Sequence, residues 1–240
     1  MKKLGITSFL VSMCVLNHTV AYAEPYLGVN LGASVVTISK DITYLQTETD
    51  LSAKYSGFRA QLLVGYDIHS LDEMTFSDLL SGDEANNRDE FYFAIEVAGN
   101  YVNGNTSENI TPWFLTTDAS VKEELTYSYD IFLLPKYRFN QNVIVFLGPG
   151  FTQGKFKTES SDTAGNLGVT GNHSEKLSGW TVKAGIEVPL SRCFSAVATY
   201  QYSKFNSKSL ENTEPLTGLN VTAKYKPEIN SLMLGVNVRL

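Results

Sequence analysis

The chain has few of the residues that build disulfides, metal centres or densely charged surfaces. Its 240 residues include two cysteines and three histidines, and 18% of them are charged, whereas soluble domains usually carry roughly 25% charged residues. Cys193 is the only cysteine after the N-terminal leader described below, so we expect a fold without an internal disulfide. No zinc-like Cys/His spacing and no glycine-rich phosphate loop occurs in the sequence, and we therefore expect no metal and no cofactor.

The first 23 residues have the pattern of a cleavable signal peptide. Lys2 and Lys3 are basic, residues 4–16 are mostly apolar and uncharged, and Ala21-Tyr22-Ala23 fits a signal-peptidase site. We predict a leader over 1–23 and a mature domain over 24–240. The alternative, an uncleaved anchor, is disfavoured because the apolar stretch is shorter than the roughly 20 residues of a spanning helix. Losing two lysines moves the formal net charge from −6 to −8, which argues against a nucleic-acid partner.

After the leader there is no apolar run long enough for a transmembrane helix. A chain without such a helix can still span a membrane as a closed barrel, because closure pairs every backbone N–H and C=O group. The pattern that is present is apolar and polar alternation with a period of two, which is typical of strands. It is clearest at the C-terminus, where one face carries Leu232, Leu234, Val236, Val238 and Leu240.

Similar alternation predicts seven further strands, near 25–36, 57–68, 91–102, 126–139, 143–156, 177–190 and 194–205. One face of the strands is apolar, and the other carries small and hydrogen-bonding residues with isolated charges. That face has too little charge for a solvated exterior and suits a narrow lumen. Aromatic residues gather at strand ends, as in the interfacial girdles of membrane barrels. We therefore predict an all-β fold, an eight-stranded antiparallel up-and-down transmembrane β-barrel, in preference to a soluble β-barrel.

The connections alternate between short and long. Short turns are expected at 140–142 and 191–193, and long polar loops at 37–56, 103–125, 157–176 and 206–227. Short turns belong on the periplasmic side, so both termini are expected in the periplasm. The link 69–90 is long where a short turn is expected. It could hold a short helix over 70–80, with Ser70 as N-cap and Glu73 at the third helical position.

Two prolines interrupt predicted strands. Pro135 and Pro149 lie nearly opposite each other on neighbouring strands when positions are counted from the turn at 140–142. Proline has no N–H for the ladder. We expect a bulge or weakened pairing there.

Three segments carry a resemblance to a known family: 146–151 (FLGPGF), 179–187 (GWTVKAGIE) and 198–202 (ATYQY). The chain resembles small outer-membrane barrels, namely the transmembrane domain of outer membrane protein A and the opacity-type surface antigens. The resemblance implies a monomer in the Gram-negative outer membrane, in contact with its lipid. It also implies a C-terminal strand that the barrel-assembly machinery recognises, although Leu240 replaces the usual Phe.

The resemblance to opacity-type antigens implies a surface protein whose four long loops serve adhesion or contact with host or other surfaces. We expect it to be non-enzymatic, because no catalytic arrangement is visible in the sequence. The alternatives are a structural barrel that supports envelope integrity, a narrow pore and a lipid-acting enzyme. His69 and His173 are expected on opposite sides of the membrane, and no catalytic residues are predicted. Seven charges are expected in the lumen, as an ion-pair network that plugs the barrel or as a pore lining: Arg59, Glu96, Asp130, Lys136, Lys183, Glu187 and Arg239.

Overall fold

The structure, a computed structural model, describes residues 21–44, 47–70, 90–110, 119–139, 142–162, 171–213 and 220–240. These residues form ten strands: β1 (Ala21–Tyr44), β2 (Thr47–Ser70), β3 (Glu90–Asn103), β4 (Asn105–Ile110), β5 (Ala119–Phe139), β6 (Val143–Asp162), β7 (Gly171–Pro189), β8 (Phe194–Phe205), β9 (Lys208–Thr213) and β10 (Asn220–Arg239). Within these ranges no helix is present that could cross a membrane.

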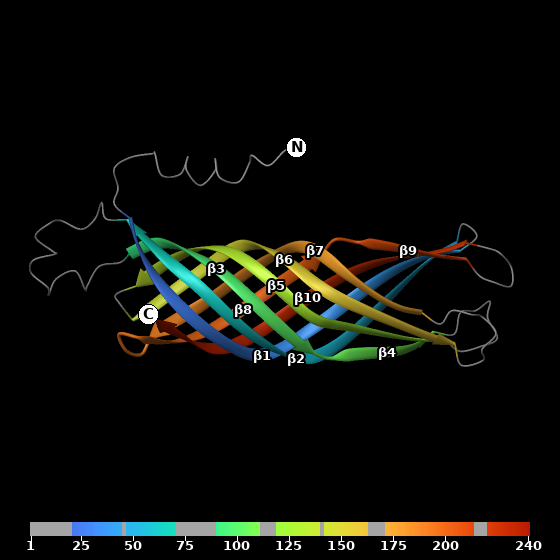
Figure 1. Ribbon diagram of the computed structural model, residues 1–240, viewed down its shortest axis with the longest axis horizontal. Coiled ribbons are helices and arrows are strands. Elements are labelled where there is room, and N and C mark those ends of the chain that lie inside the picture. The colour runs from blue at the N-terminus through green and yellow to red at the C-terminus, as the bar shows by residue number, and fades with distance from the viewer. Residues whose placement is uncertain are drawn as a thin grey trace, which may run out of the picture.

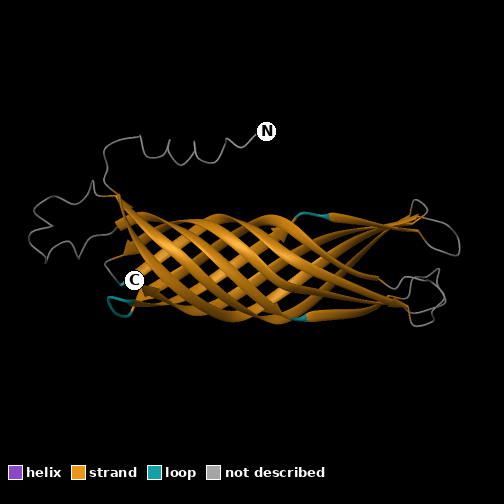
Figure 2. Ribbon diagram, viewed as in Figure 1, coloured by secondary structure: helices purple, strands orange, loops and turns teal. Residues whose placement is uncertain are grey.

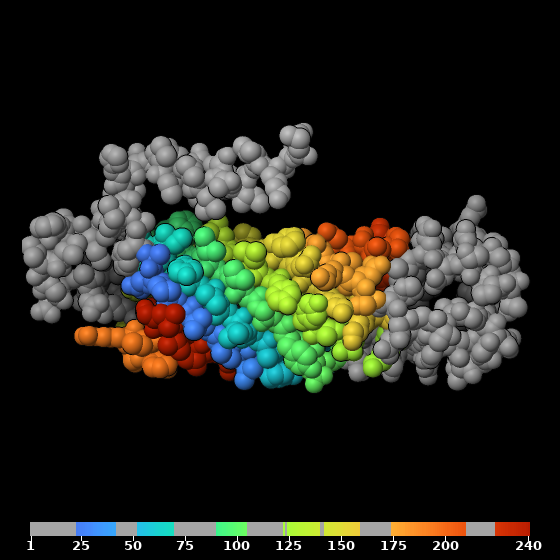
Figure 3. Space-filling model, viewed as in Figure 1, coloured from blue at the N-terminus to red at the C-terminus, as the bar shows by residue number. Residues whose placement is uncertain are grey.

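The strands close into one antiparallel barrel (Figures 1 and 2). β1 pairs with β2 on one side and with β10 on the other, which joins the two ends of the sheet. β4 continues β3, and β9 continues β8, toward the same end of the barrel. The wall therefore consists of eight strands around its circumference. Following the pairs once around the wall from Tyr26 leads back to β1 at Val36, a shift of ten residues that tilts the strands. Figure 3 shows this tilt as diagonal stripes of side chains. The predicted fold is confirmed.

Side chains alternate across the wall in the half of the barrel near the C-terminus and the start of β1. Leu234 and Leu62 are 69% and 63% exposed on the outside, whereas Lys183 and Arg59 are each 1% exposed inside. The outside is a belt of apolar residues edged by aromatic rings, including Phe91 and Phe93 at one rim and Tyr101 and Trp180 at the other. Such a continuous exposed apolar band is suited to hydrocarbon rather than water.

The alternation inverts at the other end of the barrel. Beyond Val35 in β1, the inward-facing Val36 and Ile38 are buried, while Thr37 and Ser39 face outward. The polarity of the two faces inverts at the same level in the neighbouring strands. The inward side chains there form one apolar cluster with those of β1: Val36, Ile38, Tyr55, Val102, Leu125, Phe156, Phe205 and Ile229. We call the part of the barrel around and beyond this cluster the loop-end extension. Its polar-out, apolar-in pattern is that of a barrel surrounded by water.

The loop-end extension corrects the predicted long loops. Residues 37–44 and 47–56 continue the β1–β2 hairpin, with Tyr44 paired to Thr47. The other three predicted loops likewise consist largely of paired strand, up to the links 111–118, 163–170 and 214–219. The outward polar positions suggested loops, although strand pairing continues. The short turn between β7 and β8 is as expected, whereas the predicted helix at 70–80 lies outside the described residues except for Ser70, which ends β2.

Candidate functional site

The middle of the lumen is a hydrogen-bonded cluster around a buried ion pair. Nη2 of Arg59 on β2 donates to Oδ2 of Asp130 on β5 at 3.1 Å. Arg59 also donates from Nη1 to Oγ of Ser231 at 2.8 Å and from Nε to Oδ1 of Asn100 at 3.2 Å. The amide of Gln201 donates to the same Asp130 oxygen at 2.8 Å. The arginine is therefore held in place by several partners, as a buried charge requires.

A second buried ion pair lies closer to the turn end, the end of the barrel that holds the C-terminus. Glu96 on β3 is ion-paired with Lys183 on β7, across the lumen. Oε1 of the same carboxylate accepts a hydrogen bond from the Tyr26 hydroxyl at 2.6 Å. The Tyr26 ring packs directly over Gly65, where an added Cβ would lie 2.2 Å from ring carbon Cζ. Only a glycine at 65 leaves room for this ring.

Lys136 on β5 joins the remaining charges of this level. Its Nζ lies 2.9 Å from Oδ1 of Asp67 and 3.6 Å from Oε2 of Glu187. Oε1 of Glu187 in turn contacts Nη2 of Arg239 at 3.4 Å. With Glu96 and Lys183 included, this level of the lumen near the turn end holds two lysines, three carboxylates and one arginine, and each charge lies beside one of opposite sign. This arrangement offsets much of the cost of burying each charge.

All seven charges expected in the lumen face the interior, where ion pairs divide them into three groups: Arg59–Asp130, Glu96–Lys183 and Lys136–Glu187–Arg239. Six of them are at most 2% exposed, and Arg239, near the turn end, is partly exposed. Sequence reasoning missed Asp67, although it follows the same alternation as Arg59 and could have been found from it. It also missed the group beyond Lys136, where Glu90 contacts both His69 and Arg138.

Inward side chains occupy successive levels of the lumen among the described residues. The charged level near the turn end is followed by the Arg59 cluster, and this is followed by the apolar cluster of the loop-end extension. In that last cluster the rings of Phe156 and Phe205 meet edge to face, with centroids 4.8 Å apart. Eight strands enclose a space only wide enough for side chains.

The wall has a break in strand pairing between β5 and β6. Phe132 pairs with Gly150 and Lys136 pairs with Phe146, but residues 133–135 and 147–149 between them do not pair with each other. In this register, Pro149 lies opposite Leu133. Pro135 lies opposite Leu147, and neither proline can donate an N–H to the ladder. The expected weakening of pairing is confirmed. The β-bulge lies elsewhere, where the register shifts between Leu125 and Tyr127.

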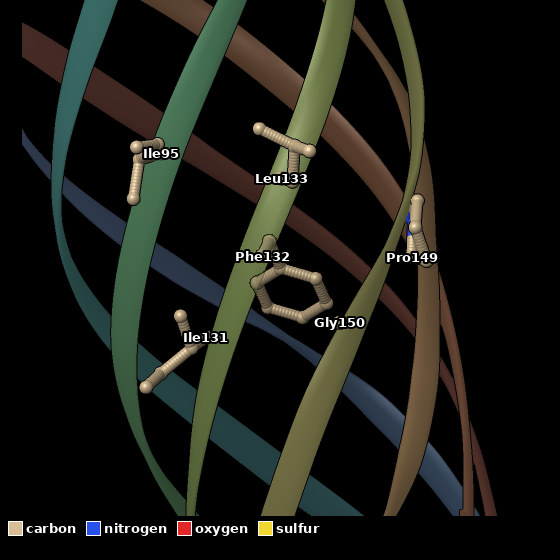
Figure 4. Close-up of a pocket in the computed structure, with 6 residues that line it drawn as sticks. All are labelled: Ile95, Ile131, Phe132, Leu133, Pro149 and Gly150. Atoms are coloured by element: carbon tan, nitrogen blue, oxygen red, sulfur yellow. The ribbon is translucent and has the colours of Figure 1, made fainter. Parts of the chain in front are cut away.

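An open pocket of about 450 Å³ lies at this break. Its lining is apolar apart from backbone: Ile95, Ile131, Phe132, Leu133, Pro149 and Gly150. In Figure 4 the Phe132 ring lies between the ribbons of β5 and β6. Ile95, Ile131 and Leu133 belong to the outward-facing belt. The pocket therefore opens on the apolar outer surface, which makes it a candidate site for a hydrocarbon group.

His69 and His173 lie far apart along the barrel. His69 is near the start of β1, where it pairs with Tyr22, whereas His173 on β7 pairs with Thr158 in the opposite half. No group of three or more His, Cys, Asp or Glu side chains that could hold a metal ion occurs among the residues described. The charged groups identified above belong instead to the ion-paired lumen.

A closed barrel with an apolar outer belt and an ion-paired interior defines a transmembrane β-barrel of the outer membrane. The family model for the outer membrane protein beta-barrel domain matches residues 6–239, and the chain belongs to this family. The protein is therefore an outer-membrane protein. No curated protein matches the chain.

Solved structures of outer-membrane barrels are similar in fold. Neisserial surface protein A (NspA) is 14% identical, with 91% of this chain and 99% of that chain covered and a TM-score of 0.41. The attachment invasion locus protein Ail of Yersinia pestis, in complex with the heparin analogue sucrose octasulfate, is 14% identical, with 88% and 99% covered and a TM-score of 0.35. The outer membrane protease OmpT of Escherichia coli is 8% identical, with 90% and 97% covered and a TM-score of 0.50. At these identities the likeness shows the fold alone.

Proposed function

We propose that this protein is a non-enzymatic surface protein, whose loop-end extension faces the outside of the cell and binds ligands on host or other surfaces. The observation that carries the proposal is the inversion of polarity at the loop-end extension. Ser39, Lys54 and Lys176 face outward there, while Tyr55 and Phe156 are buried inside. The outer surface of this end is therefore suited to water, beyond the part of the barrel that the apolar belt places in the membrane.

The length of the strands supports a projecting platform. β1 and β2 have 24 residues each, whereas a tilted strand crosses the hydrocarbon in about 9–11 residues. The excess lies at one end, opposite the C-terminus and the start of β1 (Figure 1). Ligand contacts usually come from loops held on a rigid scaffold, and continuous pairing up to Tyr44 and Thr47 supplies such a scaffold.

The filled lumen favours a surface role over transport. A pore needs a continuous aqueous path, whereas Lys136, Arg59 and Phe156 occupy successive levels of the interior. The short β7–β8 turn lies at the end that holds the C-terminus, and short turns in this class face the periplasm. Both termini are accordingly assigned to the periplasm.

The ligand-binding role is tested by shortening the β9–β10 hairpin at its tip. Removing all of 206–227 would also remove β9 and part of β10, so the variant should replace only 214–219 with Asn-Gly. We expect loss of binding of bacteria to host cells, with an unchanged shift in gel migration on boiling. A second variant makes the same replacement at 163–170, between β6 and β7, to test another part of the same end of the barrel. Full binding by both variants, with altered envelope permeability, would favour the structural role.

Orientation is tested with the native cysteine. Cys193 is exposed in the β7–β8 turn, so an impermeant maleimide should label it only after the outer membrane is permeabilised. Ser207, exposed between β8 and β9, provides the opposite marker. In the variant C193S/S207C, intact cells should be labelled directly. Labelling of Cys193 on intact cells would reverse the assignment.

A further inference from the structure

Two lysines lie next to each other just beyond the aromatic rim of the belt. Lys155 on β6 and Lys176 on β7 are directly paired across the two strands and face outward. Three other outward lysines of the extension, Lys204, Lys208 and Lys226, each have a carboxylate within ion-pair distance. Within the described residues neither Lys155 nor Lys176 has one.

Two like charges at such a pair repel each other, and an anion bound between the two ammonium groups removes this repulsion. Like charges directly opposite each other on paired strands repel, because their Cβ atoms are only about 4.5–5.5 Å apart. A phosphate accepts charge-assisted hydrogen bonds from both lysines at once and cancels the repulsion. Tyr127, the partner of Lys155 on β5, lies beside the site with its ring 6.0 Å from the Lys155 ammonium. An amphipathic ring of this kind favours the headgroup level.

The position of the pair matches the headgroup level of a bilayer. Phe151 and Trp180 are paired and exposed, and they form part of the aromatic rim at the loop-end side of the belt. Lys155 and Lys176 lie four residues further along the same strands. They are therefore the first cationic pair that a lipid headgroup meets above the hydrocarbon on this side of the barrel.

The apolar pocket lies on the same tilted strand as Lys155, nearer the turn end. Pro149 in the pocket and Lys155 are both outward-facing and six residues apart on β6. Six residues span roughly 20 Å along a strand, or about 15 Å along the bilayer normal at the usual tilt of roughly 35–45°. This is half of the roughly 30 Å hydrocarbon core. An acyl chain attached to a headgroup at Lys155 reaches the pocket at mid-membrane.

We propose that the β5–β6–β7 face binds one phosphate-bearing glycolipid of the outer leaflet, with a phosphate between Lys155 and Lys176 and an acyl chain in the pocket. The break in pairing between 133–135 and 147–149 creates the indentation that the chain fills. The lining of Ile95, Ile131 and Leu133 is apolar, and the depression is open to the outer surface of the barrel. The choice of the outer leaflet rests on the orientation proposed above. The phosphate contact with the two lysines and the acyl-chain contact with the pocket do not depend on that orientation.

Native mass spectrometry of the full-length protein in detergent tests the site, with hexa-acylated bisphosphorylated lipid A as the probe and phosphatidylethanolamine as the zwitterionic comparison. We expect one lipid A to remain bound. In K155Q/K176Q the bound fraction should fall about tenfold, since two charge-assisted contacts are lost. The control K54Q changes an exposed lysine on β2, on a distant part of the wall, and should bind as the unmodified protein does.

The pocket is tested separately by L133W, which fills it from its lining. L62W places the same ring on the exposed belt of β2, away from the pocket, as the matched control. We expect L133W to weaken lipid A binding severalfold and L62W to leave it unchanged, with both variants still showing the heat-dependent gel shift.

Equal lipid A binding by K155Q/K176Q and the unmodified protein, or equal retention of phosphatidylethanolamine, would overturn the proposal. Loss of host-cell binding in the hairpin variant with lipid A binding intact bears only on the ligand-binding role.

Discussion

The hydroxyl of Tyr26 on β1 donates a hydrogen bond of 2.6 Å to Oε1 of Glu96 on β3, across the intervening strand β2. The contact is buried and joins residues 70 positions apart in the chain. It places a neutral donor beside the carboxylate that is ion-paired with Lys183. Cross-lumen contacts of this kind fix the relative positions of strands that do not pair with each other.

Replacing Tyr26 with Phe should therefore destabilise the barrel while leaving its shape unchanged. The ring still packs over Gly65, but Glu96 loses a hydrogen-bond donor to a charged acceptor, which typically costs about 1.5–3 kcal/mol. Urea unfolding in phospholipid vesicles, followed by tryptophan fluorescence, measures the change. Y66F is the matched control, because Tyr66 is half exposed on the outer rim, and it should shift stability by no more than about 0.5 kcal/mol. Equal effects of the two substitutions would contradict the buried role of Tyr26.

The Arg59–Asp130 pair predicts a larger effect when one partner is removed. D130A leaves the Arg59 guanidinium buried without its carboxylate, and breaking a buried pair in this way costs about 3–5 kcal/mol. The double variant R59M/D130L removes both charges and should recover most of that loss. The same urea titration provides the measurement. K204Q, at the partly exposed Lys204–Glu228 pair, serves as the control and should cost at most about 1 kcal/mol. A double variant less stable than D130A would refute this account.

A filled lumen predicts little ion conduction by the unmodified protein in planar bilayers. Glu96→Ala removes the carboxylate paired with Lys183 and leaves space beside the Tyr26 hydroxyl. Water entering that space should produce small, brief current steps that the unmodified protein lacks. Single-channel recording distinguishes the two. T37A, which changes an outward-facing residue of the loop-end extension, should behave like the unmodified protein. A large and stable pore in the unmodified protein is the result incompatible with a plug.

The membrane belt could be predicted from the sequence because its environment imposes a strict period of two. Leu232 and Leu234 face outward and Met233 faces inward, as the alternation requires. The lumen charges followed from the same rule, since Lys183 and Glu187 fall on the face opposite Ile186. The specific ion pairs could not be predicted. Glu96 meets Lys183 through the tilt and closure of the wall, and a single strand carries no information about either.

The loop-end extension was missed because its pattern changes sense where the membrane ends. Val35 and Val36 are adjacent, with Val35 facing outward at the end of the belt and Val36 buried in the apolar cluster. This doubled apolar position marks the change from hydrocarbon to water outside the wall. In β5 the change coincides with the register shift between Leu125 and Tyr127. A search for one continuous alternation ends at such points, and a search for two alternations of opposite sense would have continued the strand.

The depth of the belt predicts how a charge is tolerated on the outer face. Leu234 is 69% exposed near the middle of the belt, and an arginine at the bilayer midplane of a barrel costs about 2–4 kcal/mol. L234R should lose that much stability in vesicles. N206R, on the exposed segment between β8 and β9, should change stability by at most about 1 kcal/mol. Urea titration of both variants in the same lipid measures the difference. Equal costs would place Leu234 outside the hydrocarbon.

The break between β5 and β6 predicts a local weak point that can be repaired. Pro135 and Pro149 have no N–H to donate across the pairs with Leu147 and Leu133, and the ladder is interrupted there. In P135V/P149V both donors are restored on residues that favour strands. Amide hydrogen exchange over 131–137, measured by mass spectrometry, should slow by about tenfold or more as local opening becomes rarer. The pocket should also become smaller, so lipid A binding should fall in the same variant.

The control for this repair is a proline at a strand end. Pro189 is the last residue of β7, paired with Ser195 and away from the break, so P189V should leave exchange over 131–137 unchanged. If P135V/P149V exchanged as fast as the unmodified protein, the missing N–H groups would not be the cause of the interruption. The two backbones lie close together at Gly148, where an added Cβ would lie 2.0 Å from the Leu133 carbonyl oxygen. G148A should therefore widen the break by steric clash without adding a donor, and exchange over 131–137 should become faster in that variant.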